Sequence, residues 1–276
     1  MKKTAFLFSL LLLASCGEND SSSSPLPRPA PAVTYDDHYE SLATGELFVP
    51  GDYAPVSEVD LVVHFHGANV VTEQKFTLPA ALVTVNFNGL SSAYSGPFSD
   101  SSLLGTILDE AVAKAGAARG IDNPTRGWVV LSSFSAGYGA TREILTAGNY
   151  DTWIHGVVLA DSLHAGYYNG QPNPSQMAPF LDFANQAAAG TGSMVLSHSA
   201  IVPGSYASTT ETADTLISGT GTLRVGVDLW NALGMHQTSE AVAGNFHVRG
   251  FTGQTGADHM DHLYNLDELW GILTLP

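Results

Sequence analysis

Cysteine and basic residues are scarce in this sequence of 276 residues, which has one cysteine, Cys16, and ten lysines and arginines against 26 acidic residues. A single cysteine excludes a disulfide within the chain. The formal net charge of −16 argues against nucleic acids and anionic membrane surfaces as partners, because both repel an acidic protein. Only 13% of the residues are charged and 44% are hydrophobic, which is enough for a large core in one domain.

A long apolar run is also lacking at the N-terminus, where residues 5–14 are apolar but too few for a typical membrane span. They follow Lys2 and Lys3 and lead into the string Leu-Ala-Ser-Cys-Gly, which ends at Gly17. This string resembles the bacterial lipoprotein signal, in which the cysteine is lipidated, as with palmitate, and becomes the first residue. The alternative is an ordinary secretory signal with a buried Cys16. The resemblance implies a signal peptide over residues 1–15 and a protein anchored in the cell envelope. Gly17 after the cysteine favours the outer membrane.

A tether follows over residues 16–36, whose serines and prolines offer little to bury, and the folded domain is expected over residues 37–276. Within that domain, β-branched runs alternate with stretches of helical spacing, and no internal repeat is evident. The alternation predicts an α/β fold with a mostly parallel sheet, helices on both faces and no large lid. Strands are expected at 59–65, 81–87, 127–132, 154–160, 194–197 and 246–251, and helices at 101–118, 137–146, 176–188, 209–217 and 263–273.

The segment Ser133-Phe-Ser-Ala-Gly137 joins a buried strand directly to a helix. It resembles the nucleophile elbow of the α/β-hydrolases, Gly-x-Ser-x-Gly, with Ser133 in place of the first glycine. The sharp turn exposes the hydroxyl of Ser135, the candidate nucleophile. The helix N-terminus behind it offers the N–H of Ala136 to an oxyanion. The alternative is an ordinary serine-rich turn.

An earlier strand ends in His64-Phe-His66-Gly67-Ala68. In the α/β-hydrolases a His-Gly pair at this place shapes the loop that donates the second oxyanion-hole N–H. The resemblance assigns that donor to Ala68, with Gly67 as the adjacent candidate. The alternative is a strand that simply ends in His-Gly.

The C-terminal string Gly256-Ala-Asp-His259-Met-Asp-His262-Leu is similar to the end of many α/β-hydrolases, where a histidine in a loop after the last strand returns over the elbow. His259 occupies the position of the catalytic base, which takes the proton of Ser135 and returns it to the leaving group. His262 is a rival for this role.

The acid of the triad lies between nucleophile and histidine in this family, commonly in the turn after the penultimate strand. Here that turn, residues 197–202, contains no carboxylate. Asp161 ends the preceding strand, at the edge of an open α/β sheet where ligands gather, and is the candidate acid. Glu211 is the second candidate, and a turn-capping role for Asp161 is the structural alternative.

Together these motifs predict a serine hydrolase, esterase- or lipase-like, that cleaves a carboxylic ester through an acyl-enzyme without a cofactor or metal. Its partner is a small or polymeric ester, and its only contact with the membrane is the lipid anchor. Amide or peptide cleavage by the same triad is an alternative. Two others are a metal-dependent hydrolase, in which His64, His66, His259, Asp261 and His262 supply ligands, and a non-catalytic surface protein that binds a glycan or a protein.

Overall fold

The computed structural model describes residues 35–148 and 152–276. The signal peptide, Cys16 and nearly all of the tether predicted from the sequence lie outside these residues. The described residues form one compact unit. None of the helices in the part of the chain that the structure describes is long and apolar enough to cross a membrane.

The unit is built on a ten-stranded sheet with the strand order β1-β2-β4-β3-β5-β6-β9-β12-β11-β10. The central run from β4 to β12 is parallel, and the strands outside it pair antiparallel. The parallel strands are β4 (Ala81–Val85), β3 (Glu58–Phe65), β5 (Thr125–Phe134), β6 (Ile154–Ala160), β9 (Ser193–His198) and β12 (Phe246–Phe251). The flanking strands are β1 (His38–Ser41), β2 (Glu46–Val49), β11 (His236–Ala243) and β10 (Arg224–Trp230).

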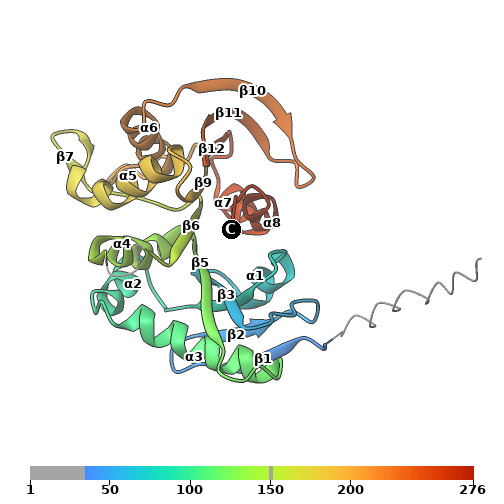
Figure 1. Cartoon of the computed structure of the whole chain (residues 1–276). Coiled ribbons are helices and arrows are strands. Elements are labelled where there is room, and N and C mark those ends of the chain that lie inside the picture. Colours follow the sequence, from blue (N-terminus) through green and yellow to red (C-terminus); the bar gives the residue numbers. More distant parts are fainter. Residues whose placement is uncertain (1–34, 149–151) are drawn as a thin grey trace, which may run out of the picture. The chain divides into compact units, whose positions relative to one another are not determined.

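Helices cover both faces of the sheet, which confirms the fold class predicted from the sequence (Figure 1). One face carries α2 (Ser91–Phe98), α3 (Leu103–Ala118), α4 (Tyr138–Ala147), α5 (Pro174–Ala188) and α6 (Thr209–Gly219). The other carries α1 (Asn69–Lys75), α7 (Gly256–Tyr264) and α8 (Leu266–Trp270). Two separate apolar clusters form the core, one on each face, because the parallel strands bury side chains in both directions.

The C-terminal helix differs from the expectation. Instead of one helix over 263–273, the chain forms α7 and α8, with Asn265 between them. Helix α7 begins early because the side chain of Thr255 accepts from the N–H of Asp258 while the Asp258 carboxylate caps Thr255. His259 therefore lies in the first turn of a helix rather than in a loop, and a helix holds its ring more firmly than a loop would.

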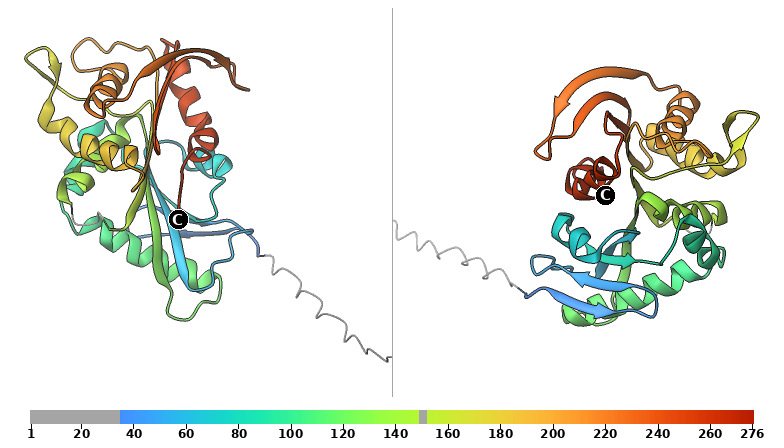
Figure 2. Two further views of the ribbon diagram at one scale, coloured as in Figure 1. Left: turned by 45° about the horizontal axis from the view of Figure 1, so that its top comes forward. Right: turned by 180° about the vertical axis from the view of Figure 1, so that it is seen from behind.

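The helices α1 and α2 were not predicted, and neither were three pairs of strands. The strands β1 and β2 extend the sheet at one edge, β10 and β11 extend it at the other, and the short strands β7 (Tyr167–Tyr168) and β8 (Gln171–Pro172) form a small separate hairpin. Both views in Figure 2 show the β10–β11 hairpin arching past the parallel strands on the side of α7. Trp230, Met235 and His262 line a common hollow there, so the hairpin packs near the helix that carries His259.

The strand order places the candidate site. After β3 the chain moves to β4 on one side, and after β5, on the other side of β3, it moves away to β6. The loops after β3 and β5 therefore diverge at a switch point of the sheet. Ligands bind outside the carboxyl ends of the strands at such points. Ser135 follows β5 and the His66–Gly67 turn follows β3, at this same edge.

Candidate active site

Ser135 lies on a strained turn between β5 and α4. It starts a short 3₁₀ segment, Ser135–Gly137, and its φ of 48° is in the left-handed region that residues with a Cβ rarely adopt. The close approach of the chain to β3 explains the glycine two residues on, because a Cβ on Gly137 would lie 2.1 Å from the carbonyl oxygen of Phe65. The turn raises the Ser135 hydroxyl above the sheet edge.

The serine that replaces the usual first glycine of the elbow has a structural use. Ser133 is fully buried, and its Oγ lies 2.9 Å from Oγ of Ser162. The hydroxyl of Ser162 in turn donates to the carbonyl oxygen of Ser135 at 2.8 Å. These contacts tie the strained turn to the loop after β6. Ser162 carries no motif signal, and sequence reasoning missed it.

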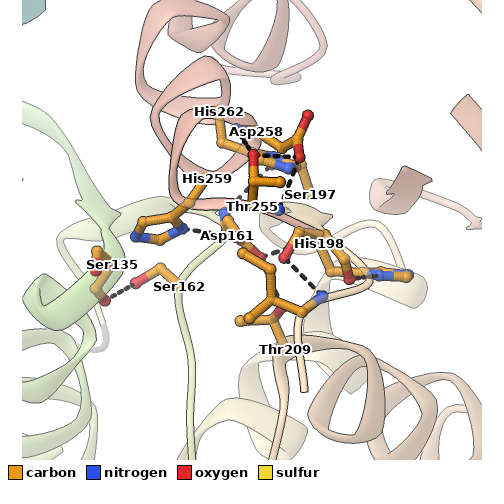
Figure 3. A network of polar contacts seen from close by, with 12 residues as sticks. Ser135, Asp161, Ser162, Ser197, His198, Thr209, Thr255, Asp258, His259 and His262 are labelled. Atoms are coloured by element: carbon orange, nitrogen blue, oxygen red, sulfur yellow. Dashed lines mark hydrogen bonds and ion pairs between the residues drawn. The ribbon is translucent and has the colours of Figure 1, made fainter. Parts of the chain in front are cut away.

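The predicted base and acid meet directly. Nδ1 of His259, in the first turn of α7, lies 2.6 Å from Oδ2 of Asp161, which follows β6 (Figure 3). Both residues line one hollow together with Ser135; we call it the His259 cavity, and Ile201 and Gln254 also line it. Figure 3 shows the imidazole between the carboxylate and Ser135. Its outer nitrogen, Nε2, is therefore the one available to the nucleophile.

Asp161 is only 2% exposed, and its second oxygen is fully engaged. Oδ1 accepts hydrogen bonds from the N–H of Ser199 at 2.8 Å and from the hydroxyl of Thr209 at 2.6 Å. Burial alone would raise the pKa of Asp161, but the hydrogen bonds from His259, Thr209 and Ser199 outweigh burial and hold the pKa well below its ordinary value. The carboxylate is thus ionised at neutral pH and able to stabilise an imidazolium.

The ring of His259 also packs against Phe134, the residue before Ser135. Phe134 stacks on it with ring centroids 4.5 Å apart and an interplanar angle of 28°. Among residues 35–148 and 152–276 no hydrogen bond joins Oγ of Ser135 to the imidazole. Such contacts between nucleophile and base are often long in ligand-free enzymes and tighten when substrate binds.

The loop after β3 is held from below by His64. This fully buried side chain donates from Nε2 to the carbonyl oxygen of His66 at 2.8 Å and accepts at Nδ1 from Ser132 Oγ at 2.8 Å. Burial lowers the pKa of His64 to about 3, so the ring is neutral and has one donor and one acceptor, as these two contacts require. The bond fixes a turn in which His66 has φ 70° and Gly67 has φ 126°.

The two predicted oxyanion donors have different surroundings. Ala136, in the first turn behind Ser135, lines a second hollow that also opens on Ser135. Ala68 is an exposed residue at the N-cap of α1 and lines neither hollow. Gly67 packs beneath α7, since a Cβ there would lie 2.9 Å from Cδ1 of Leu263.

The rival base is engaged elsewhere. His262 is buried, and its Nδ1 lies 2.7 Å from Oγ of Ser197, a hydroxyl that also approaches the N–H of Asp161 at 3.4 Å. His262 therefore supports the end of β9 beside the acid and does not line the His259 cavity.

The rival acid is a helix cap. Glu211 accepts from the N–H and the hydroxyl of Ser208 at 2.8 Å each, which completes a capping box on α6, and Tyr167 donates to its carboxylate. The hydrogen bond from the Ser208 N–H is the main cause that lowers the pKa of Glu211. No contact joins Glu211 to His259 among the described residues.

The two histidines of the metal alternative that lie near the end of β3 and just after it are engaged in other contacts. Both nitrogens of His64 are engaged, and Nδ1 of His66 lies 2.8 Å from the hydroxyl of Tyr94. Within the described ranges no group of three histidine, cysteine or acidic side chains is arranged to hold a metal ion.

The second hollow, a cavity of about 390 Å³, was not anticipated from the sequence. We call it the Arg142 cavity; it is lined by Ser135, Ala136, Tyr138, Arg142, His164 and Tyr206, among others. His164 and Tyr206 also line the His259 cavity, so the two hollows flank Ser135 and share a wall. No sequence motif marks Arg142, which lies in α4 one turn after Tyr138 and over its ring.

Comparisons with known proteins find weak structural likenesses only. No family model matches the chain, and no curated protein matches it. A cold-adapted esterase from an Arctic intertidal metagenomic library aligns with a TM-score of 0.43 and 10% identity, over 84% of this chain and 93% of that one. A monoglyceride lipase from Saccharomyces cerevisiae aligns with a TM-score of 0.40 and 9% identity, over 91% and 99%. Ferric enterobactin esterase from Salmonella typhimurium aligns with a TM-score of 0.40 and 15% identity, over 63% and 46%. At this level of similarity the matches assign no activity to the chain.

Proposed function

We propose that this protein is a serine hydrolase that cleaves carboxylic esters by way of an acyl-enzyme. The contact of 2.6 Å between Nδ1 of His259 and Oδ2 of Asp161, in a cavity that Ser135 also lines, carries the proposal. A buried carboxylate with a lowered pKa beneath a partly exposed imidazole, next to a serine on a strained strand-to-helix turn, is the arrangement that activates a hydroxyl nucleophile.

The reaction has two steps. His259 Nε2 takes the Ser135 proton as Oγ attacks the ester carbonyl, and the N–H of Ala136, with a donor from the loop after β3, stabilises the oxyanion. Collapse of the intermediate breaks the bond to the alcohol, which receives the proton from the imidazolium and leaves. Water then repeats the sequence on the acyl-enzyme and releases a carboxylic acid and free Ser135. Asp161 holds the ring with its Nδ1–H inward throughout.

Esters are the first choice of substrate because an alkoxide leaves with less help from the acid than an amine does. Amides and peptides are the second choice, and the same groups would serve them. The chemistry needs no cofactor.

The N-terminal string supports a location. The Leu-Ala-Ser-Cys-Gly sequence ending at Gly17 and the Ser/Pro-rich residues after it fit a lipoprotein whose hydrolase domain stands off a bacterial membrane, with the outer membrane favoured. We include this cell-envelope location in the proposal.

The test is covalent labelling. A fluorophosphonate probe should modify wild-type protein at Ser135, and Ser135→Ala should lose both the label and turnover of 4-nitrophenyl esters. Ser218→Ala, at an exposed serine of α6, is the matched control and should keep both. Labelling that persists in Ser135→Ala, or turnover that a chelator removes, would refute the serine mechanism; absence of labelling and turnover in wild type would favour the non-catalytic reading.

A further inference from the structure

The two hollows beside Ser135 have different chemistry. The His259 cavity contains the base, whereas the Arg142 cavity contains Ala136, the oxyanion donor, and lacks His259. Both open on Ser135, so a substrate whose carbonyl carbon meets Oγ can extend one portion into each.

The proton transfers of the proposed mechanism decide which portion goes where. The leaving alcohol must receive its proton from the imidazolium, so its oxygen lies on the His259 side. The acyl portion keeps its carbonyl oxygen at the oxyanion donors and extends away from the base. The acyl portion therefore occupies the Arg142 cavity.

Charge distinguishes this cavity from the rest of the chain. The sequence has 26 acidic residues and ten lysines and arginines, yet Arg142 is the one charged side chain among the described residues that line the cavity. A cation without a lining carboxylate is the reverse of the protein's overall balance. The net charge of −16 repels anions at long range. A cationic cavity beside Ser135 therefore suggests that a ligand with a negative charge binds there.

Arg142 packs against Tyr138, but the terminal nitrogens of its guanidinium make no hydrogen bond with the described residues. Its side chain is 16% exposed and lies over the ring of Tyr138, with 5.4 Å to the ring centroid. Its carboxylate neighbour is Glu143, whose oxygen lies 3.8 Å from Nε, beyond hydrogen-bond distance. Among the described residues the two terminal nitrogens have no recorded hydrogen-bond acceptor, so the planar fork is left for a ligand.

The reach fits a short acyl chain. Ser135 precedes α4, and Arg142 lies in α4 four residues, or about 6 Å along the axis, after its first residue, Tyr138. Long helical side chains lean back toward the N-terminus, which brings the guanidinium of Arg142 closer to Ser135 than its Cα. A chain of a few carbons from the reacting carbonyl then ends near the guanidinium.

We propose that the acyl portion of the substrate ends in a carboxylate that Arg142 binds, so that the enzyme acts on half-esters of short dicarboxylic acids. This rests on the proposed function. The planar guanidinium fork matches a carboxylate, and an Arg–carboxylate pair in a hollow shielded on one side by Tyr138 is stronger than an exposed pair.

The experiment compares two 4-nitrophenyl esters that have the same acyl chain and differ in the charge at its end. 4-Nitrophenyl hydrogen adipate carries a terminal carboxylate, and 4-nitrophenyl methyl adipate carries a neutral methyl ester in its place. The readout is the ratio of their kcat/KM values, corrected for uncatalysed hydrolysis. We expect wild type to prefer the anionic ester about tenfold, with the preference in KM and weaker at high salt.

Variants assign the effect to one side chain. Arg142→Gln should lower the ratio about tenfold, and Arg142→Lys should keep part of it, since lysine retains the charge but not the fork. Arg126→Gln is the matched control: Arg126 lies near the start of β5, against Trp153 and Asp109, at the opposite end of the strand from Ser135, and the change should leave the ratio as in wild type.

Each outcome is distinct. A wild-type ratio of one or less overturns the inference while leaving the serine hydrolase intact, because the neutral ester is still turned over. A fall in Arg126→Gln equal to that in Arg142→Gln overturns it as well, since bulk charge would then explain the preference. If wild type hydrolyses neither ester and takes no fluorophosphonate label, the proposed function itself has failed.

Discussion

Asp161 and His259 are 98 positions apart in the chain, and their facing side-chain atoms are 2.6 Å apart. The α/β-hydrolases commonly have their carboxylate in the turn that corresponds to the one after β9. That turn contains none in this chain, and the contact identifies Asp161 as the carboxylate that His259 meets instead. Asp161 stands one strand earlier, after β6, and the turn after β9 supplies a hydrogen bond instead, from the N–H of Ser199 to the other carboxylate oxygen. The Asp161 carboxylate is therefore held by groups at the ends of two adjacent strands, β6 and β9.

Replacing Asp161 by asparagine tests this arrangement. Asp161→Asn keeps the shape but removes the charge that fixes the His259 tautomer and stabilises the imidazolium. We expect turnover of a chromogenic ester to fall by three to four decades, on the order seen when a triad acid is neutralised. Kinetics should be compared at equal folded fraction, with thermal melts beside them.

Glu211→Gln is the control for that substitution. Glu211 caps α6 and does not contact His259 among the described residues, so its loss should cost about 1 kcal/mol of stability and leave turnover within a few-fold. A large loss of turnover in Glu211→Gln beside a mild one in Asp161→Asn would reverse the assignment of the acid.

The buried His262 predicts a dependence of stability on pH. Burial lowers its pKa to about 4 from the ordinary 6.5, so between these values the unfolded chain binds a proton that the folded protein does not. Stability from this group is complete above pH 6.5 and is lost as the pH falls toward 4. A difference of 2.5 pKa units corresponds to about 3 kcal/mol.

Urea unfolding at pH 8 and pH 5 measures this. His64, with its pKa lowered to about 3, contributes in the same direction, so wild type should lose stability on acidification. His262→Asn, which keeps a polar atom for Ser197, should lose less over the same interval. Equal losses in the two proteins would show that protonation of His262 does not cause the loss of stability at low pH.

The central strands of the sheet were predictable because runs of apolar, β-branched residues mark them in the sequence. Strands β6 and β12 have the bounds expected from sequence. β6 is almost fully buried and mostly apolar, whereas β12 alternates buried and half-buried positions along its first four residues. The strands β10 and β11 were not predicted because β10, at the edge of the sheet, is exposed at most positions, and β11 beside it has few buried positions and many polar residues. Their identity comes from pairing with β12, a partner that a local window does not contain.

The candidate site likewise contains residues that the sequence predicted and residues that it did not. Ser135 and His259 were predicted from motifs, and Asp161 from its place at a strand end and its order in the chain; the structure brings His259 and Asp161 into contact. Ser162, His164 and Arg142 were not predicted, because each acts through contacts between loops or helices that only the fold brings together. The early start of α7 did have a sequence signal, the capping box of Thr255 and Asp258, which was overlooked beside the apolar run after residue 262.

The proposed lipid anchor leads to a separate prediction for the N-terminus. Full-length protein expressed in a Gram-negative host should fractionate with membranes and incorporate a labelled fatty acid. Cys16→Ala should abolish the incorporation, because the thiol is the acceptor. Cys16→Ala with an unaltered hydrolase domain should retain specific activity. Wild-type protein recovered in the soluble fraction with a free Cys16 thiol would contradict the anchor.

The hydroxyl of Ser162 should matter for catalysis although it touches no substrate. It donates to the carbonyl oxygen of Ser135 at 2.8 Å and lies 2.9 Å from Ser133 Oγ, and it is 2% exposed. Ser162→Ala leaves both partners short of a hydrogen bond and should cost about 1 to 2 kcal/mol of stability. Because Ser135 is held at φ 48°, loosening the turn also displaces its hydroxyl, and we expect kcat to fall roughly tenfold with KM nearly unchanged.

Thr220→Ala separates positioning from general destabilisation. Thr220 ends α6, where its hydroxyl contacts the carbonyl oxygen of Leu216 and Thr222 Oγ1 at 2.9 and 2.8 Å, away from both cavities. Thr220→Ala should lower the urea midpoint about as much as Ser162→Ala does, while its kcat stays at the wild-type value. If Ser162→Ala also keeps wild-type kcat, the strained turn holds itself through Gly137 and the backbone of β3, and Ser162 contributes stability alone. A fall in kcat in Ser162→Ala alone would instead mean that the hydroxyls of Ser133 and Ser162 together position the side chain of Ser135.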